Sequence, residues 1–543
     1  MVDGGDIFRM IFPLGTASGV RMSERKNITR AAGVLGLATG LSRIAGLVRD
    51  MVVAALFGAG FGTDAFFIAF TIPNLLRRFF AEGSLTAAFV PTYSEVYHRD
   101  GREQAREVAN ICMTLLVLVM SGVTLLGIWG SPWLVEIVGH GFGAVEGKLE
   151  LTDFLNRIMF PYIFFVSLLA LLTGILNVMG HYFVPAVSPL LLNLSMILCA
   201  LWLHTRFEVG ITALAVGVVV GGVLQLLIQV PVVHSLDIRL RPDFRFRHPR
   251  VRRIAWLMLP GLLGVAIYQI NVVVSRLLAS FLPEGSVSFL YYGQRLFEFP
   301  QGIFIVSLAQ AVLPAMSRQV GSHDDQGFRE SLQYALILIA LITIPASVGL
   351  YLCSEPIFSL FFMKGAFLAE DVRQTALALA AYAPGLFFVG VSRVIVPAFY
   401  ARQDTRTPVW ISFWTLLMNV ALGLLLMRPF GHVGLAAALT LASVFNSCAL
   451  LWALRRKMGR LGLASVASAL ARILPATVIM GITVWALLRL VSWLEPGRIL
   501  LKGSVLGGTI AVGCLIFALG CMLLRVPYTE QALTLIKRKV LKR

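Results

Sequence analysis

The amino-acid sequence predicts an all-α polytopic membrane protein with fourteen transmembrane helices. Hydrophobic residues make up 58% of the 543 residues and charged residues only 14%, whereas a soluble protein usually carries about 25% charged residues. The mean hydropathy is +0.82, and apolar runs of about 20 residues, long enough to cross a bilayer as a helix, recur along the whole chain. The predicted spans lie at 31–57, 63–92, 108–129, 155–179, 184–204, 209–233, 253–281, 288–316, 331–353, 375–400, 408–427, 432–454, 467–490 and 501–524.

The basic residues predict the orientation of these spans. Clusters of Arg and Lys follow the second, sixth, tenth and twelfth spans and end the chain, on the same side as a basic N-terminal arm. The connection 131–153, on the opposite side, carries four acidic residues against one lysine, Lys148. The positive-inside rule therefore predicts that both termini are cytoplasmic, which agrees with an even number of spans. The net charge of +18 then reflects topology and contact with anionic lipid, and it does not indicate nucleic-acid binding.

Cysteine and histidine residues indicate neither a disulfide framework nor a metal site. The six cysteines lie inside or at the ends of apolar spans without CxxC spacing, and the eight histidines are scattered. Cysteines in such positions are usually small core residues. A metal enzyme is therefore unsupported. We expect a transport protein, not an enzyme, with no cofactor, and coupling to the membrane potential or to an ion gradient stays open.

An internal repeat predicts two lobes. Three segments return in the same order about 223 residues later, the third one residue out of phase: AFVPTYS at 88–94 as AVLPAMS at 311–317, PYIFFV at 161–166 as PGLFFV at 384–389, and VGITA at 209–213 as VGLAA at 433–437. Spans one to six then correspond to spans seven to twelve. Because six is even, the two repeats are parallel, as in transporters whose halves surround a central cavity.

The predicted domains follow from this repeat. Spans thirteen and fourteen have no counterpart, so they form an appendage to the two six-helix lobes. The boundaries are a cytoplasmic N-terminal arm at 1–28, an N-lobe at 29–234, a basic cytoplasmic linker at 235–252, a C-lobe at 253–457, the appendage at 458–525 and a basic cytoplasmic tail at 526–543.

The first span carries Ser42, Arg43, Arg49 and Asp50. Residues seven apart return to nearly the same helix face, about 10 Å along the axis. Ser42 and Arg49 therefore share one stripe, and Arg43 and Asp50 share the next. Gly46 lies between them and leaves room for a neighbouring helix or a ligand.

The second span contains Asp64 near its outer end and then Pro73, Arg77, Arg78 and Glu82. Because proline removes a helix hydrogen bond, we expect a kink or break near the arginines.

The eighth span, the repeat partner of the second, places Arg295 and Glu298 on one face directly before Pro300. Charge beside a helix breaker in corresponding elements of two repeats indicates a transporter's substrate site.

Arginine at these depths suggests an anion as the ligand. An arginine at the centre of a membrane helix costs about 2.5–3.5 kcal/mol on insertion scales, and structural polar contacts are made at lower cost by Ser, Thr or Asn. The guanidinium group also matches phosphate or pyrophosphate with two parallel hydrogen bonds. For single residues the alternatives are that Arg49 or Arg78 reaches the headgroup layer, or that Arg295 and Glu298 form a structural ion pair.

Two long motifs resemble a known family. LSRIAGLVRDMVVAALFGAGFGTDAFFIAFTIPNLLRRFFAEGSLTAAFVP, at 41–91, and GSVSFLYYGQRLFEFPQGIF, at 285–304, closely resemble the signatures of the MurJ/MviN family of lipid II flippases. That family belongs to the multidrug/oligosaccharidyl-lipid/polysaccharide exporter superfamily. The resemblance implies that Arg43, Arg49, Arg77 and Arg295 engage the pyrophosphate and sugar headgroup of the substrate. It implies functional roles also for Ser42, Asp50, Asp64, Glu82, Ser288 and Glu298.

The resemblance implies a function, a location and a substrate. The expected function is translocation of the undecaprenyl-pyrophosphate-linked peptidoglycan precursor, lipid II, from the inner to the outer leaflet of the bacterial cytoplasmic membrane by alternating access, for cell-wall synthesis. Expected partners are lipid II, membrane lipids and other cell-wall synthesis proteins. The alternatives are a flippase for another lipid-linked oligosaccharide and a multidrug or organic-cation exporter of the same superfamily. One departure is Gln294, where relatives often carry Asp.

Overall fold

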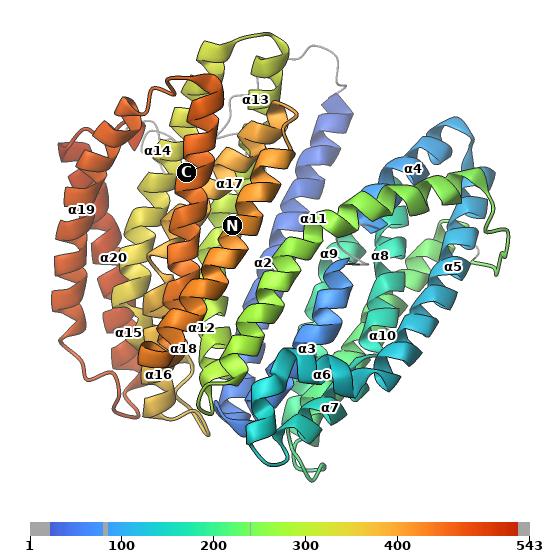
Figure 1. Cartoon of the computed structure of the whole chain (residues 1–543), viewed down its shortest axis with the longest axis horizontal. Helices are drawn as coiled ribbons and strands as arrows, with labels where there is room; N and C mark the ends of the chain where they lie inside the picture. Colours follow the sequence, from blue (N-terminus) through green and yellow to red (C-terminus); the bar gives the residue numbers. More distant parts are fainter. Residues whose placement is uncertain (1–21, 80–84, 239, 530–543) are drawn as a thin grey trace. The chain divides into compact units, whose positions relative to one another are not determined.

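The computed structural model describes residues 22–79, 85–238 and 240–529, and none of these residues belongs to a β-strand. Predictions that concern most of the N-terminal arm, Glu82 and most of the C-terminal tail lie outside these residues. The helices divide into two compact units, Met1–Glu284 and Gly285–Arg543. Figure 1 shows the elements of each unit.

Among the described residues, unit 1 runs from α2 to α11. Short α6, the 3-10 helix η2 and α7 lie between the longer helices α5 and α8. In order they are α2 (Met22–Phe57), α3 (Phe61–Arg77), α4 (Thr86–Arg99), α5 (Arg102–Trp129), α6 (Ser131–Gly139), η2 (His140–Ala144), α7 (Lys148–Met159), α8 (Tyr162–Val178), α9 (Phe183–Leu203), α10 (Thr212–Ser235) and α11 (Pro249–Ser280).

Unit 2 begins with a helix that passes into a π-helical segment, η3, and ends with the two helices of the predicted appendage. In order its elements are α12 (Ser286–Pro300), η3 (Gln301–Ile305), α13 (Val306–Gly321), α14 (Asp325–Leu352), α15 (Ser354–Phe361), α16 (Ala369–Tyr382), α17 (Gly385–Ala401), α18 (Arg406–Met458), α19 (Ala464–Leu488) and α20 (Ile499–Leu523).

The helices account for the fourteen predicted spans. By length and hydropathy alone, eight helices among the described residues could cross a membrane, or nine if α16 and α17, which meet at 41°, are one span. At about 1.5 Å per residue, α18 would be about 80 Å long, far more than a bilayer core of about 30 Å. Gly431 interrupts it with φ 57° and ψ −135°, so α18 is two spans. The other four predicted spans lie on α2, α3 with α4, α11, and α12 with α13, which are broken or carry arginine.

The 223-residue offset of the sequence repeat recurs in the helix boundaries. α5 begins at Arg102 and α14 at Asp325, and α8 begins at Tyr162 and α17 at Gly385. π-Helical turns follow α3 at residues 78–79 and α12 at residues 301–305. Near the arginines of the second span the α-helix thus passes into a π-helical turn after Arg77, whereas α3 continues through Pro73. The expected kink or break stays a prediction.

The connection 131–153, in which the sequence predicts no span, contains helices. Most of it is helical, in α6, η2 and the start of α7. Its counterpart in unit 2 begins with α15 at Ser354, again 223 residues after the start of α6 at Ser131. Both helices are short, so hydropathy alone does not reveal them.

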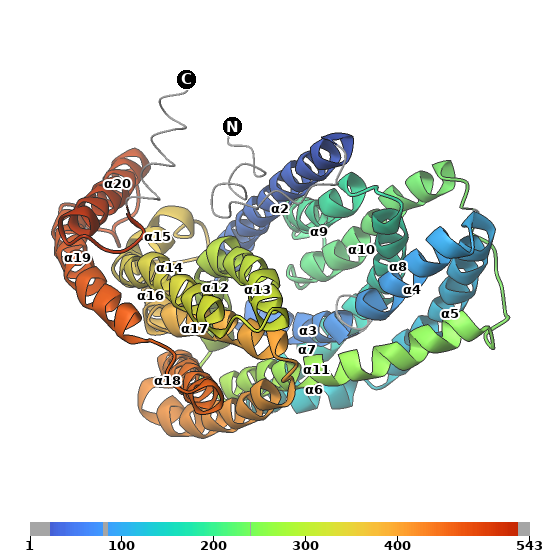
Figure 2. The ribbon, with the colours of Figure 1, turned by 90° about the horizontal axis from the view of Figure 1, so that it is seen from above.

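Glycines let α9 and α10 pack closely in unit 1, where the two helices run side by side (Figure 2). A Cβ atom on Gly221 would lie 2.5 Å from Ser195 Oγ, and one on Gly217 would lie 2.8 Å from the Cα of Met196. Small residues are the usual means of close helix approach in membranes. This packing fixes α9, which also contacts α2.

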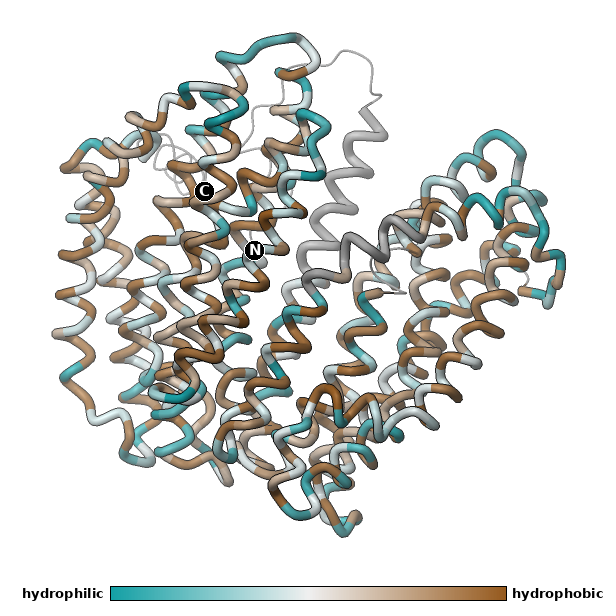
Figure 3. The backbone as a smooth tube through the Cα atoms, viewed as in Figure 1, coloured by the Kyte–Doolittle hydropathy of each residue, from teal (hydrophilic) through white to brown (hydrophobic). Residues whose placement is uncertain are grey.

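Apolar residues cover the middle of the helices, and polar residues gather towards their ends (Figure 3). The core of unit 1 joins α4, α5, α8 and α11 through buried side chains such as Phe89, Ile111, Leu172 and Ile254. This arrangement suits a chain whose outer surface meets lipid.

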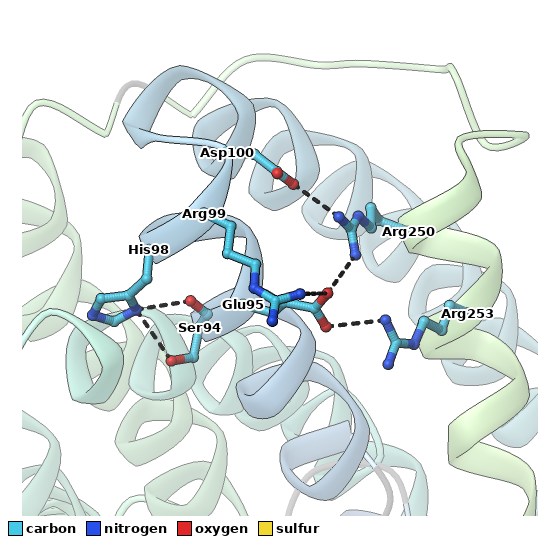
Figure 4. Close-up of polar contacts among 7 residues, drawn as sticks. All are labelled: Ser94, Glu95, His98, Arg99, Asp100, Arg250 and Arg253. Atoms are coloured by element: carbon cyan, nitrogen blue, oxygen red, sulfur yellow. Dashed lines mark hydrogen bonds and ion pairs between the residues drawn. The ribbon is translucent and has the colours of Figure 1, made fainter.

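α11 belongs to unit 1 by its contacts, although it is the first helix of the second sequence repeat. Glu95 of α4 accepts hydrogen bonds from Arg250 and Arg253 of α11, each at 3.0 Å, and Arg250 also donates to Asp100 at 3.0 Å (Figure 4). The hydrogen bond from Arg250 is the main reason why the pKa of Glu95 lies below its usual value. The compact units and the repeats therefore differ at α11, and the predicted lobe boundaries stay a prediction.

Candidate functional site

The predicted site residues of unit 1 begin on α2. Ser42 and Arg43 are half-buried, whereas Arg49 and Asp50 are 6% and 2% exposed. Arg49 donates from Nε and Nη2 to Oδ1 of Asp50, at 3.0 and 2.6 Å. A carboxylate beside the guanidinium lowers the cost of burying its charge.

Asn193 of α9 holds this part of α2, and the sequence analysis missed it. Its Oδ1 accepts a hydrogen bond from Nη1 of Arg49 at 3.1 Å, and its Nδ2 donates to the backbone oxygen of Ser42 at 3.2 Å. Asn193 thus contacts α2 at both Ser42 and Arg49, which agrees with the predicted stripe. The signal in the sequence was a single asparagine in an otherwise apolar stretch of the span 184–204.

Asp64 forms a buried ion pair with Lys148 of α7. Nζ of Lys148 lies 3.0 Å from Oδ2 of Asp64, and both side chains are 2% exposed. The ammonium group also lies 4.4 Å from the ring centre of Phe142, within the range of a cation–π interaction. Sequence reasoning treated Lys148 as a loop residue, although a lone lysine in an acidic connection was a signal for an internal partner.

Arg77 and Arg78 lie where α3 passes into the π-helical turn. Both are half-buried, and Nε of Arg77 donates to Oδ1 of Asn74 at 2.9 Å. Asn74 thus orients one arginine from one turn earlier on the same helix. Their position at a change of helix type agrees with the frequent occurrence of π-helical turns at functional sites.

In unit 2 the predicted site residues lie on α12. Ser288 is fully buried, and Gln294, Arg295 and Glu298 are half-buried. Nε2 of Gln294 donates to Oε1 of Glu298 at 3.1 Å. Gln294, the residue that departs from the family pattern, therefore donates a hydrogen bond to the carboxylate of Glu298, three residues after Arg295.

The structure thus joins some of the predicted residues and leaves one prediction open. Ser42, Arg49 and Asp50 form one hydrogen-bonded group with Asn193. The convergence of Arg43, Arg49 and Arg77 with Arg295 on one cavity stays a prediction.

Unit 2 also has an apolar groove between α14 and α19. Its volume is about 420 Å³, and Ile344, Val348, Leu474, Gly481 and Trp485 are among its lining residues. α19 is the first helix of the predicted appendage. The groove suits a hydrocarbon chain and offers almost no polar contact.

Among the described residues, no three His, Cys, Asp or Glu side chains are grouped so that they could hold a metal ion. The chemistry that the described site residues offer is hydrogen bonding and charge compensation by arginine.

Comparisons with known proteins agree on one family. Residues 53–501 match the family model described as "Lipid II flippase MurJ". A probable lipid II flippase MurJ of Vibrio cholerae serotype O1 is 38% identical over 500 residues, which cover 90% of this chain and 94% of the relative. The lipid II flippase MurJ of Burkholderia cenocepacia is 35% identical over 435 residues, which cover 79% of this chain and 84% of the relative.

Solved structures share the fold. A lipid II flippase MurJ in an inward closed conformation matches with a TM-score of 0.75 and 28% identity, over 90% of this chain and 98% of that protein. An inward-facing MATE family transporter of the MOP superfamily matches with a TM-score of 0.65 and 15% identity, over 78% of this chain and 95% of that protein. At that identity the second match shows the fold alone.

Proposed function

This chain belongs to the MurJ family of lipid II flippases, and from that membership we propose that it moves lipid II across a bacterial membrane. The observation that carries the proposal is the match to a curated relative over 94% of the relative's length. The matched range, 53–501, includes Arg77, Arg295 and the Asp64–Lys148 pair. The same relatives favour lipid II over other lipid-linked oligosaccharides and over drugs.

The proposed chemistry is recognition of a diphosphate by arginine, with no covalent step. Arg43, Arg49, Arg77 and Arg295 supply guanidinium groups that stay charged when buried and that bind phosphate oxygens in pairs. Arg49 donates to the carboxylate of Asp50 and to the amide of Asn193, and Arg77 donates to the amide of Asn74. The diphosphate replaces some of these acceptors when it binds.

The proposed path separates the polar and apolar parts of the substrate. The headgroup crosses in a polar cavity by alternating access, while the polyprenyl chain stays among apolar surfaces. The apolar groove between α14 and α19, lined by Val348, Leu474 and Trp485 among others, is the proposed binding site for part of that chain. We propose that Gly46 lets α2 bend when the cavity changes its open side.

The proposed location is the bacterial cytoplasmic membrane with both termini in the cytoplasm. The basic loops support this orientation through the positive-inside rule. Cysteine probes at 136–150 should react from outside intact cells, and probes at 239–250 should react only after the membrane is opened. Labelling of 239–250 in intact cells would contradict the orientation.

The transport proposal is tested by depletion of the native protein and complementation with variants. Arg43→Ala, Arg77→Ala and Arg295→Ala should each insert normally, fail to support growth, and leave lipid II in the inner leaflet in an accessibility assay. Arg49→Ala should fail in the same assays, but it also takes the guanidinium partner from the buried Asp50, so its unfolding temperature is measured beside them. Lysine at these positions should rescue poorly because it lacks the planar fork. Arg157→Ala is the control, since Arg157 is a half-exposed residue in an i,i+4 ion pair with Asp153. Growth with all four alanine variants would show that these arginines do not bind the substrate.

A further inference from the structure

A small pocket opens in unit 1, and none of the predicted transport residues lines it. Its volume is about 160 Å³, room for about five water molecules at about 30 Å³ each. It lies where α4 ends, α5 begins, and α8 and α10 end. Its lining residues are Tyr93, Tyr97, Arg102, Glu103, Arg106, Met179, Leu236, Asp237 and Ile238.

Tyr93 is a buried residue whose side chain lines this pocket. Its side chain is 1% exposed, and its ring stacks on Phe89 at 5.1 Å and on Tyr97 at 6.5 Å between ring centres. The hydroxyl has no hydrogen-bond partner among the described residues. Because this hydroxyl makes no hydrogen bond within the described part of the protein and Tyr93 lines the pocket, it is available to a ligand that accepts or donates a hydrogen bond there.

Positive charge reaches the same pocket from the first turns of α5. Arg102 is exposed, and Arg106 is half-buried and only 4.0 Å from Glu103. α5 is a helix of 28 residues that begins after Gly101, and no side chain caps its first turn. Two arginines and uncapped backbone N–H groups at the start of a long helix form an anion site, and phosphate is the anion that helix N-termini most often bind.

Two carboxylates limit the charge of the ligand. Glu103 and Asp237 also line the pocket, and both are exposed. Two carboxylates and two guanidinium groups leave the lining without net charge. A ligand that carries a phosphate and an amine fits this lining better than one with a net negative charge.

The location identifies the source of such a ligand. The pocket lies just beyond the predicted ends of the spans 63–92, 155–179 and 209–233 and before the start of the span 108–129. This is the depth of the lipid headgroups on either side of a bilayer, where Tyr and Arg are favoured. We propose that the pocket binds the phosphoethanolamine headgroup of a membrane phospholipid. The proposal goes beyond lipid II transport and does not depend on it.

Binding to the purified full-length protein in detergent tests the proposal. Native mass spectrometry counts bound dimyristoyl phosphatidylethanolamine as the lipid concentration rises. Arg102→Gln should weaken this binding about tenfold, and Tyr93→Phe, which removes one neutral hydrogen bond, about threefold. Arg99→Gln is the matched control, because Arg99 ends α4 on the same side and does not line the pocket. It should leave binding unchanged.

Further probes distinguish the source of the phosphate. Glycerophosphoethanolamine, which has no acyl chains, should compete for the site, whereas dimyristoyl phosphatidylglycerol should bind more weakly. Tyr93→Phe should not lower the unfolding temperature, since it breaks no hydrogen bond within the protein. Equal losses in Arg99→Gln and Arg102→Gln would overturn the proposal. A preference for phosphatidylglycerol, or inorganic phosphate competing as well as glycerophosphoethanolamine, would overturn it too.

Discussion

Replacing Lys148 by methionine should destabilise the protein strongly. Lys148 and Asp64 are each 2% exposed and 3.0 Å apart, so the substitution leaves a buried carboxylate without its ammonium partner. Breaking a buried ion pair in this way costs about 3–5 kcal/mol. The lost cation–π contact with Phe142 adds to this cost in the same direction.

The double variant Asp64→Leu/Lys148→Met separates the cost of a lone charge from the value of the pair. Replacing both partners of a buried pair by apolar residues is often neutral or stabilising. The double variant should therefore be more stable than Lys148→Met alone, and the coupling in the double-mutant cycle should be large. Thermal unfolding of the purified variants in detergent measures this order, with Lys148→Met expected to lose at least about 5 °C.

A control on the same helix makes the result specific. Arg157 of α7 pairs with Asp153 at 2.8 Å but is 44% exposed, and exposed pairs contribute about 1 kcal/mol or less. Arg157→Met should therefore change the unfolding temperature little. If Lys148→Met unfolded at the wild-type temperature but lost lipid II transport, the pair would belong to the substrate site and the stability argument would be refuted.

Three further predictions concern the polar contacts of both units. Gln294→Asp removes the hydrogen bond to Glu298 and sets two carboxylates at i,i+4, so it should weaken lipid II affinity modestly and preserve transport; higher affinity of the purified variant would contradict this. Asn193→Ala removes hydrogen bonds on both sides of its amide and should cost about 1–3 kcal/mol in thermal unfolding and slow transport, so a fully stable and active variant would count against it. Burial alone would raise the pKa of Asp404, but hydrogen bonding, first from Lys457, lowers it to about 2. The ionised Asp404 therefore stabilises the fold fully above about pH 4, and this contribution is lost as the pH falls towards 2. It amounts to about 1 kcal/mol or less. Unfolding temperatures measured across that pH range should show the loss in the wild type and not in Asp404→Asn.

The spans and the repeat could be predicted because they depend on local composition. Long apolar runs mark α5, α8 and α10 without knowledge of any neighbour. The offset of 223 residues, read from short motifs, reappears in the starts of α5 and α14 at Arg102 and Asp325. Short helices such as α6 could not be predicted from hydropathy, because a helix of nine residues is too short to be recognised as a span.

The partners of the predicted site residues could not be read in this way. Helix periodicity places Ser42 and Arg49 on one stripe, but it cannot say which of the other helices faces that stripe. Asn193 lies 144 residues from Arg49, and Lys148 lies 84 residues from Asp64. Such pairings depend on tertiary packing, which the periodicity of a single helix does not contain.

The ion pairs between α4 and α11 have a consequence for how the protein is made. Glu95 emerges from the ribosome 155 residues before Arg250. The four long helices α5, α8, α9 and α10 are synthesised between them. Domains generally fold as units during synthesis. Unit 1 therefore cannot complete its contacts until α11, a helix of the second sequence repeat, has been synthesised. A gene split after residue 234 would leave Glu95 and Asp100 without their α11 partners, whereas a split after residue 284 would keep every contact of that cluster within one fragment.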